Sequence, residues 1–82
     1  MRIVAELPHP DCKITIFSMN QKFIVKLEQG PYEQSYKIAE LDLTGGVNEI
    51  FQLLDEDFLK SVVERFKTMR TDFVATYNRH QF

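Results

Sequence analysis

The sequence predicts a small α+β domain, in which an antiparallel sheet of about four strands packs on one long C-terminal amphipathic helix. Two patterns carry this prediction. Residues Lys13 to Gln29 form two runs of alternating apolar and polar residues separated by Asn20-Gln21, as in a β-hairpin. From Leu59 to Tyr77, apolar residues recur at spacings of three and four, as on one face of a helix.

A two-residue loop at Asn20-Gln21 fixes the pairing of the hairpin, because the numbers of two facing residues must then add up to 41. Ile16 therefore faces Val25 on an apolar side, and Phe17 faces Ile24 on the other side. The first side is the expected core. The second side is mixed and is expected to face solvent; its further pairs are Thr15 with Lys26 and Lys13 with Glu28.

Two further stretches read as strands. Arg2 to Leu7 alternates weakly, which predicts a short first strand. After Gly30-Pro31, alternation resumes from Gln34 to Leu41, with Tyr36 and Ile38 on the same face. This stretch is expected to form another strand of the antiparallel sheet.

The segment from Val47 to Leu54 fits two patterns. Apolar residues at Val47, Ile50 and Leu54 fit a helical stripe, whereas alternation along the same stretch fits a strand buried on both faces. Asp55 is a good N-cap and starts a new helix. Because a helix already running would not need restarting, we expect the segment to be the last strand of the sheet.

The C-terminal helix is expected to run from Asp55 to about Asn78, with acids at its start and bases towards its end that suit the helix dipole. A helix of this length spans about 35 Å, against about 25 Å for strands of seven or eight residues, so its last turns overhang the sheet. Phe73, Val74 and Tyr77 then need another surface. A second copy of the chain would supply it, so these three are the predicted dimer-interface residues.

Composition places the chain among single cytoplasmic domains. We expect the 82 residues to form one domain, with a sheet (1–54), a helix (55–79) and a short tail (80–82). Cys12 is the only cysteine, so no intramolecular disulfide can form and a reducing compartment is expected. No segment is apolar enough to predict a signal sequence or a membrane span.

Residues with catalytic or metal-binding chemistry are sparse. His9, Asp11 and Cys12 lie close together, but prolines flank the histidine and restrict its backbone. The acids Asp55 to Asp57 stand where helix starts normally carry acids, and Thr44-Gly45-Gly46 lacks the spacing and lysine of a phosphate loop. We therefore predict no catalytic residue, no metal, no cofactor and no enzymatic activity.

From Gln21 to Phe66 the chain resembles one repeat of the PUR (Pur-alpha-like) family of single-stranded nucleic-acid-binding proteins. The similar pieces are QKFIVKLEQ, KIAEL, a glycine-containing turn and EIFQLLD, followed by a helix with apolar periodicity. The resemblance implies a sheet packed on a helix, two intertwined repeats, and nucleic acid lying along the sheet against basic and aromatic side chains. A chain with one repeat would form a homodimer with itself.

On this resemblance, the mixed sheet face is expected to bind single-stranded DNA or RNA. The loop that is rich in arginine and glycine in the family is here Gly30 to Ser35, which has no basic residue and weakens the attraction for phosphate. The same face also fits a solvated surface, and the alternative function is a structural module that binds an unidentified protein partner. The predicted nucleic-acid-binding residues are Lys13, Phe17, Lys22, Lys26, Tyr36 and Lys37.

Overall fold

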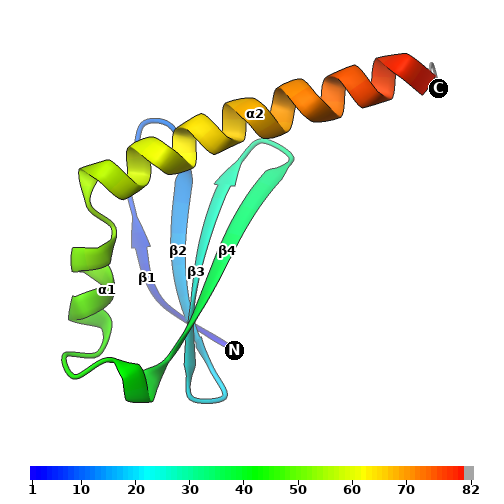
Figure 1. The fold of residues 1–82 in the computed structure, drawn as a ribbon. Helices are drawn as coiled ribbons and strands as arrows, with labels where there is room; N and C mark the ends of the chain where they lie inside the picture. The colour runs from blue at the N-terminus through cyan, green and yellow to red at the C-terminus, as the bar shows by residue number, and fades with distance from the viewer. Residues whose placement is uncertain (81–82) are drawn as a thin grey trace.

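The computed structural model describes residues 1–80, which form a four-stranded antiparallel sheet followed by helices. The strands lie in chain order, β1-β2-β3-β4, and Figure 1 shows α2 crossing one end of the sheet while α1 stands beside it. This arrangement confirms the predicted α+β class of a sheet followed by a long C-terminal helix. The elements are β1 (Arg2–Leu7), β2 (Lys13–Met19), β3 (Lys22–Gln29), β4 (Tyr32–Ala39), the 3-10 helix η1 (Glu40–Asp42), α1 (Val47–Leu53) and α2 (Glu56–His80).

The β2–β3 hairpin has the predicted register. All its pairs complete the sum 41, from Lys13 opposite Glu28 to Met19 opposite Lys22. The loop Asn20-Gln21 has φ angles of 50° and 63°, the left-handed pair that a two-residue turn needs to match the strand twist. The turn chemistry and the apolar alternation therefore select the same pairing.

Strand β4 is displaced by two residues from the predicted range 34–41. It starts at Tyr32, because Gly30-Pro31 is by itself the whole two-residue loop, with Gly30 at φ 59°. It ends at Ala39, and Leu41 falls in η1 with 96% of its surface exposed. The pairing with β3 completes the sum 61 and runs without a shift.

Strand β1 lies where the sequence predicts it but contains a bulge. The register with β2 shifts between Ile3 and Ala5. Ile3 consequently lies opposite Phe17, whereas Ala5 lies opposite the buried Ile16. Simple alternation would place Ile3 and Ala5 on the same face of the sheet. The extra residue of the bulge reverses the faces before it, so the two residues lie on opposite faces.

The expectation that 47–54 forms a strand is wrong, because Val47–Leu53 is the helix α1. Ile50 is fully buried, as the helical stripe requires. At the start of α1, one carboxylate oxygen of Glu49 accepts hydrogen bonds from the Thr44 hydroxyl at 2.6 Å and from the Gly45 amide at 2.9 Å. The helix restarts at α2 because the chain changes direction between the two helices, as Figure 1 shows. The sheet therefore ends at residue 39, and the predicted sheet region 1–54 includes a helix.

Helix α2 begins as predicted, with the Asp55 carboxylate accepting a hydrogen bond of 2.8 Å from the amide of Phe58. Its first half packs on the sheet, where Val62 and Phe66 are fully buried. Every residue from 70 to 80 is exposed, and Figure 1 shows the helix continuing past β4. The overhang expected from the helix length is thus present. His80, assigned to a tail from the sequence, belongs to α2, and residues 81 and 82 of that tail lie outside the described residues.

The core lies between the sheet and the two helices. The central strands β2 and β3 supply most of it, and α1 and α2 close it from one side. Within residues 1–80, neither helix is long and apolar enough to cross a membrane. The buried apolar residues are Ile14, Ile16, Phe23, Val25, Leu27, Ile50, Val62 and Phe66.

Candidate nucleic-acid interface

The sheet has two faces, one against the helices and one directed away from them. Opposite residues of an antiparallel pair point to the same face, so the registers assign each strand residue to a face. We call the face directed away from the helices the open face. Its residues are Ile3, Glu6, Lys13, Thr15, Phe17, Met19, Lys22, Ile24, Lys26, Glu28, Glu33, Ser35, Lys37 and Ala39.

The structure brings five of the six predicted nucleic-acid-binding residues together on the open face. Lys13 and Phe17 come from β2, Lys22 and Lys26 from β3, and Lys37 from β4. Their common face follows from the alternation of each strand and from the two tight turns that fix the registers. The sheet therefore presents cations from three neighbouring strands on one surface.

A largely apolar row crosses the open face. Ile3, Phe17, Ile24 and Lys37 lie opposite one another on the four successive strands. Phe17 and Ile24 are half-buried, and Ile3 is 55% exposed because the β1 bulge turns it outwards. The bulge in β1 thus adds the apolar residue Ile3 to the open face.

The centre of the open face is closely packed. Thr15 lies opposite Glu6 on one side and Lys26 on the other, and only 3% of its surface is exposed. The long side chains on either side account for this burial. A ligand on this face would therefore contact side-chain surfaces and not enter a cleft.

Glutamates on the open face offset much of its positive charge. Lys26 Nζ lies 3.5 Å from a carboxylate oxygen of Glu33 and 4.0 Å from one of Glu28. Within the described residues, no acidic group lies within ion-pair distance of Lys22 or Lys37. Lys22 and Lys37 lie where β3 begins and β4 ends, next to the apolar row, and Lys13 at the start of β2 likewise has no such partner among the described residues.

Tyr36 is on the other face of the sheet, so its expected place on the open face is wrong. It lies opposite the buried Val25, and its ring meets Phe58 edge to face at 5.4 Å. Its hydroxyl group accepts a hydrogen bond of 2.9 Å from Arg65 and donates one of 3.2 Å to the side-chain oxygen of Gln34. Tyr36 therefore joins the sheet to α2, and it cannot stack on nucleic acid that is bound at the open face.

A signal for the correct placement of Tyr36 was present in the sequence. When Gly30-Pro31 is treated as a two-residue loop, the partners complete the sum 61 and Tyr36 falls opposite Val25. Because Val25 belongs to the core side of the first hairpin, Tyr36 must as well. Applying the same rule for facing residue numbers to the second turn as well as the first therefore places Tyr36 on the core side of the sheet.

Two arginines of α2 attach this helix to the sheet. Arg70 donates a hydrogen bond of 2.7 Å to the side-chain oxygen of Gln29, and its guanidinium lies 5.6 Å from the centre of the Tyr32 ring. Arg65 donates to Gln34 at 3.0 Å in addition to Tyr36. These contacts give both arginines a structural role at the junction of β4 and α2.

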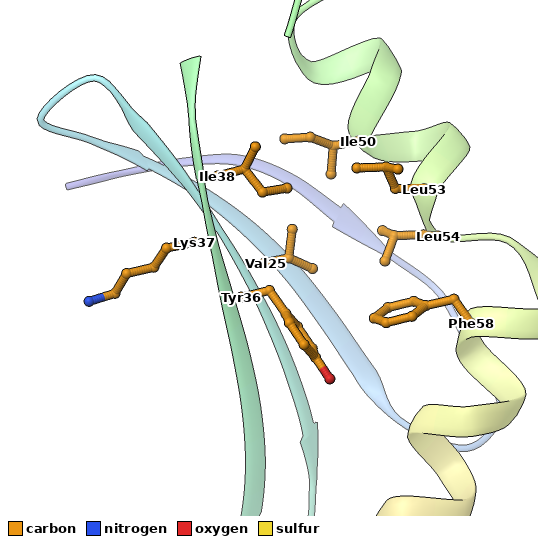
Figure 2. A pocket seen from close by; sticks show the side chains of 8 residues that line it. All are labelled: Val25, Tyr36, Lys37, Ile38, Ile50, Leu53, Leu54 and Phe58. Atoms are coloured by element: carbon orange, nitrogen blue, oxygen red, sulfur yellow. The ribbon is translucent and has the colours of Figure 1, made fainter. Parts of the chain in front are cut away.

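An apolar pocket of about 310 Å³ lies between β4 and the two helices, as shown in Figure 2. Lys37 stands at its edge but points away from it, so the interior offers almost no polar group. Leu53 on its rim is 53% exposed. The pocket has the character of an apolar contact surface. Its lining residues are Val25, Tyr36, Lys37, Ile38, Ile50, Leu53, Leu54 and Phe58.

The group of His9, Asp11 and Cys12 forms a local turn contact. His9 Nδ1 accepts a hydrogen bond of 3.1 Å from the Asp11 amide and lies 3.8 Å from Cys12 Sγ. Burial raises the pKa of the Cys12 thiol, and the negative charge of Asp11 raises it further. The thiol is therefore held in its protonated form, which is a poor ligand. Within residues 1–80, no cluster of three or more metal-ligating side chains forms.

The predicted dimer-interface residues lie on the overhanging part of α2. Phe73, Val74 and Tyr77 are 62%, 46% and 51% exposed. Phe73 also packs edge to face on Tyr32, with ring centres 6.3 Å apart. The overhang is therefore attached to the sheet at its base, while its apolar side chains remain accessible.

The fold and the open face define a small α+β domain whose antiparallel meander is covered by helices on one side only. No protein-family model, curated protein or solved structure matches this chain.

Proposed function

We propose that this protein is a small homodimeric module that binds single-stranded DNA or RNA through the open face. The observation that carries the proposal is the gathering of Lys13, Phe17, Lys22, Lys26 and Lys37 on the sheet surface that the helices leave uncovered. The resemblance to a PUR repeat supports the same use of the sheet. The apolar overhang of α2 supports the homodimer.

The open face offers the two kinds of contact that a single strand requires. Phe17 and Ile24 offer an apolar surface for bases, and stacking on an aromatic ring is worth about 1–3 kcal/mol per base. Lys22 and Lys37 flank that surface with positive charge that no described acid offsets. Because each phosphate contact releases counterions, binding is expected to weaken as salt increases.

The charge balance sets the expected strength. On the open face, four lysines stand against the three glutamates Glu6, Glu28 and Glu33, which leaves a net charge of +1 on this face. Attraction to phosphate is therefore modest, and stacking contributes a large share of the affinity. Binding of moderate affinity with little base preference is the expected behaviour.

The test is a fluorescence-polarisation titration of short single-stranded DNA and RNA at two salt concentrations, beside light scattering that gives the mass of the bound species. Saturable binding that weakens with salt is expected. Phe17→Ala and Lys26→Glu should reduce it, and Lys22→Ala should lower the salt slope by about 1. Lys60→Ala, an exposed change on α2, is the matched control and should leave binding unchanged. Absent or salt-independent binding contradicts the proposal.

The alternative is a non-enzymatic structural module that binds another protein. It is favoured by exposed apolar residues outside the open face, namely Leu41 at 96%, Leu53 at 53% and Phe51 at 39% exposure. A partner retained in a pull-down after nuclease treatment, with no binding of oligonucleotides, would support it. For either function we propose a cytoplasmic location, which the single free thiol of Cys12 supports.

A further inference from the structure

We infer that two copies of this chain pair through the free edges of strand β4, antiparallel and in the register in which Glu33 lies opposite the partner's Lys37. This interface rests on the homodimer of the proposed function and specifies how the two copies meet. It joins the two sheets into one continuous sheet about a two-fold axis at Ser35.

The two edges of the sheet differ in how they are protected. The outer strand β1 carries a bulge between Ile3 and Ala5, a device that interrupts pairing at an edge. Strand β4 pairs with β3 along eight residues without a shift and contains no proline. Within the described part of the chain, no strand pairs with the outer side of β4. Such a long, regular edge is a template for another strand.

The backbone groups available on this edge follow from the β3–β4 turn. Gln29 and Tyr32 flank the two-residue loop, so they form a hydrogen-bonded pair. Hydrogen-bonded and non-hydrogen-bonded pairs alternate along an antiparallel ladder. Glu33, Ser35 and Lys37 therefore direct their amide and carbonyl groups away from β3, towards the free edge.

The side chains of β4 select one register for a two-fold pair. The same faces of the two sheets come together only when the numbers of two facing β4 residues add up to an even number. When they add up to 70, Glu33 lies opposite the partner's Lys37, and the two-fold axis repeats this pair. Opposite charges on directly facing residues stabilise a strand pair. The neighbouring sum 72 places Glu33 opposite an alanine, and the sum 68 places Lys37 opposite Pro31, which has no amide hydrogen to donate.

The overhang of α2 fits the same register. It passes beyond β4 on the helix-covered face, and Phe73 at its base packs on Tyr32. With the sum 70, Tyr32 lies opposite the partner's Ile38, which in each copy lines the apolar pocket of Figure 2. The exposed Phe73 and Val74 are thereby brought towards the partner's pocket and its exposed Leu53. The register with the sum 70 would therefore cover both the overhang of α2 and the apolar pocket.

The pairing also extends the candidate binding surface. Residues that share a face in one copy continue onto the same face of the partner, so the two open faces become one surface. Glu33, which already pairs with Lys26 at 3.5 Å, comes to lie between that lysine and the partner's Lys37. A single strand of nucleic acid would then cross both copies.

Cysteine cross-linking tests the register directly. In a Cys12→Ser background, Ser35→Cys places two thiols on the two-fold axis, at a Cα separation of about 5.5 Å that a disulfide spans. Ala39→Cys, on the same strand and face but outside the charge pair, is the matched control, because its two copies lie eight residues apart, about 26 Å. Under mild oxidation, Ser35→Cys should give a covalent dimer at least about ten times faster than Ala39→Cys. Equal rates, or no cross-link from Ser35→Cys, would overturn the register.

A charge exchange gives a second, independent test. Glu33→Lys and Lys37→Glu each place like charges opposite one another twice, and each should raise the dimer dissociation constant by roughly tenfold. The double variant E33K/K37E restores opposite charges and should return the constant to near that of the unaltered chain. Sedimentation equilibrium measures the dimer dissociation constants of the unaltered chain, the two single variants and the double variant. A double variant as weak as the single ones would overturn the pairing.

The outcomes separate this interface from the nucleic-acid function. If the protein has the mass of a dimer but cross-links no better through Ser35→Cys than through Ala39→Cys, the β4 interface is overturned and the two copies must meet elsewhere. A monomer that binds oligonucleotides overturns the interface and leaves the binding function. A dimer cross-linked at Ser35→Cys that binds no oligonucleotide supports the interface and overturns the function.

Discussion

The guanidinium of Arg65 donates a hydrogen bond of 2.9 Å to the hydroxyl oxygen of Tyr36, and this contact joins α2 to the edge strand β4. Gln34 extends the junction, since its side-chain nitrogen donates to the backbone oxygen of Val62 at 3.0 Å. The helix is thus held on the sheet by polar contacts beside the apolar core. The position of the overhang, and of every surface attached to it, depends on this junction.

Replacing Tyr36 by phenylalanine should weaken the junction without affecting the open face. The variant keeps the ring contact with Phe58 but loses the hydroxyl, which should lower the free energy of unfolding by about 1 kcal/mol in a urea titration. Oligonucleotide binding by the folded variant should not change. Tyr32→Phe is the control, because no described hydrogen bond involves the Tyr32 hydroxyl. A binding defect confined to Tyr36→Phe would contradict the assignment of Tyr36 to the helix-covered face.

Two substitutions in α1 distinguish a helix from a strand buried on both faces. Ile50 is fully buried, so Ile50→Ala should cost about 2–5 kcal/mol of stability. The next residue of α1, Phe51, is 39% exposed, and Phe51→Ala should cost much less. Denaturant unfolding measures both. If Ile50→Ala leaves no folded protein, Ile50→Val, with an expected cost of about 0.5–1.5 kcal/mol, provides the comparison. Equal costs at the two positions would contradict the helix.

The parts of the fold that sequence predicts well are those where two local signals agree. The Asn20-Gln21 turn and the flanking apolar alternation require the same register, and the structure has it. At the start of α2, the capping residue Asp55 and the apolar stripe around Val62 likewise agree. Agreement between turn or cap chemistry and side-chain pattern leaves little for tertiary contacts to decide.

The parts that sequence misses depend on contacts between distant segments. The apolar residues of Val47–Leu53 fit both the helical spacing and the alternation of a strand. The segment forms a helix because Ile50 then packs into a core built by β2, β3 and α2. For the candidate site, alternation shows that Tyr36 and Ile38 share a face but not which face that is. That answer requires the pairing with β3, which the turn at Gly30-Pro31 supplies.

The start of α1 should respond to acid through Glu49. Its carboxylate accepts hydrogen bonds from the Thr44 hydroxyl and the Gly45 amide, and these bonds lower the pKa of Glu49. A carboxyl group whose pKa is lowered by folding adds stability above its unfolded pKa of about 4.3, and this stability is lost as pH falls through the lower folded value. Thr44→Val removes the largest cause of the shift.

The stability difference between the unaltered chain and Thr44→Val should therefore be greatest near neutral pH and shrink below about pH 4.3. Urea unfolding followed by circular dichroism across this range measures it. Thr71→Val on α2 is the control, because its hydroxyl donates to the Lys67 backbone oxygen and, within the described residues, makes no hydrogen bond to a carboxylate. A difference that grows as the solution becomes more acidic would contradict the assigned role of Glu49.

The overhang of α2 gives the last prediction, which concerns dimer formation. Val74 is 46% exposed on the apolar side of the overhang, so Val74→Asp should place a charge in the proposed contact with a second copy and raise the dimer dissociation constant at least about tenfold. Thr71→Asp introduces the same charge on the side of the helix directed away from the sheet, and light scattering should find its mass unchanged.

Ending the chain after Met69 removes the whole overhang, including Phe73, while retaining the buried Val62 and Phe66. The shortened chain should stay folded, because its core is intact, and should behave as a monomer at concentrations where the full chain is a dimer. An unchanged oligomeric mass for both this truncation and Val74→Asp would show that the overhang takes no part in dimer formation. The edge of β4 would then have to hold the two copies together by itself.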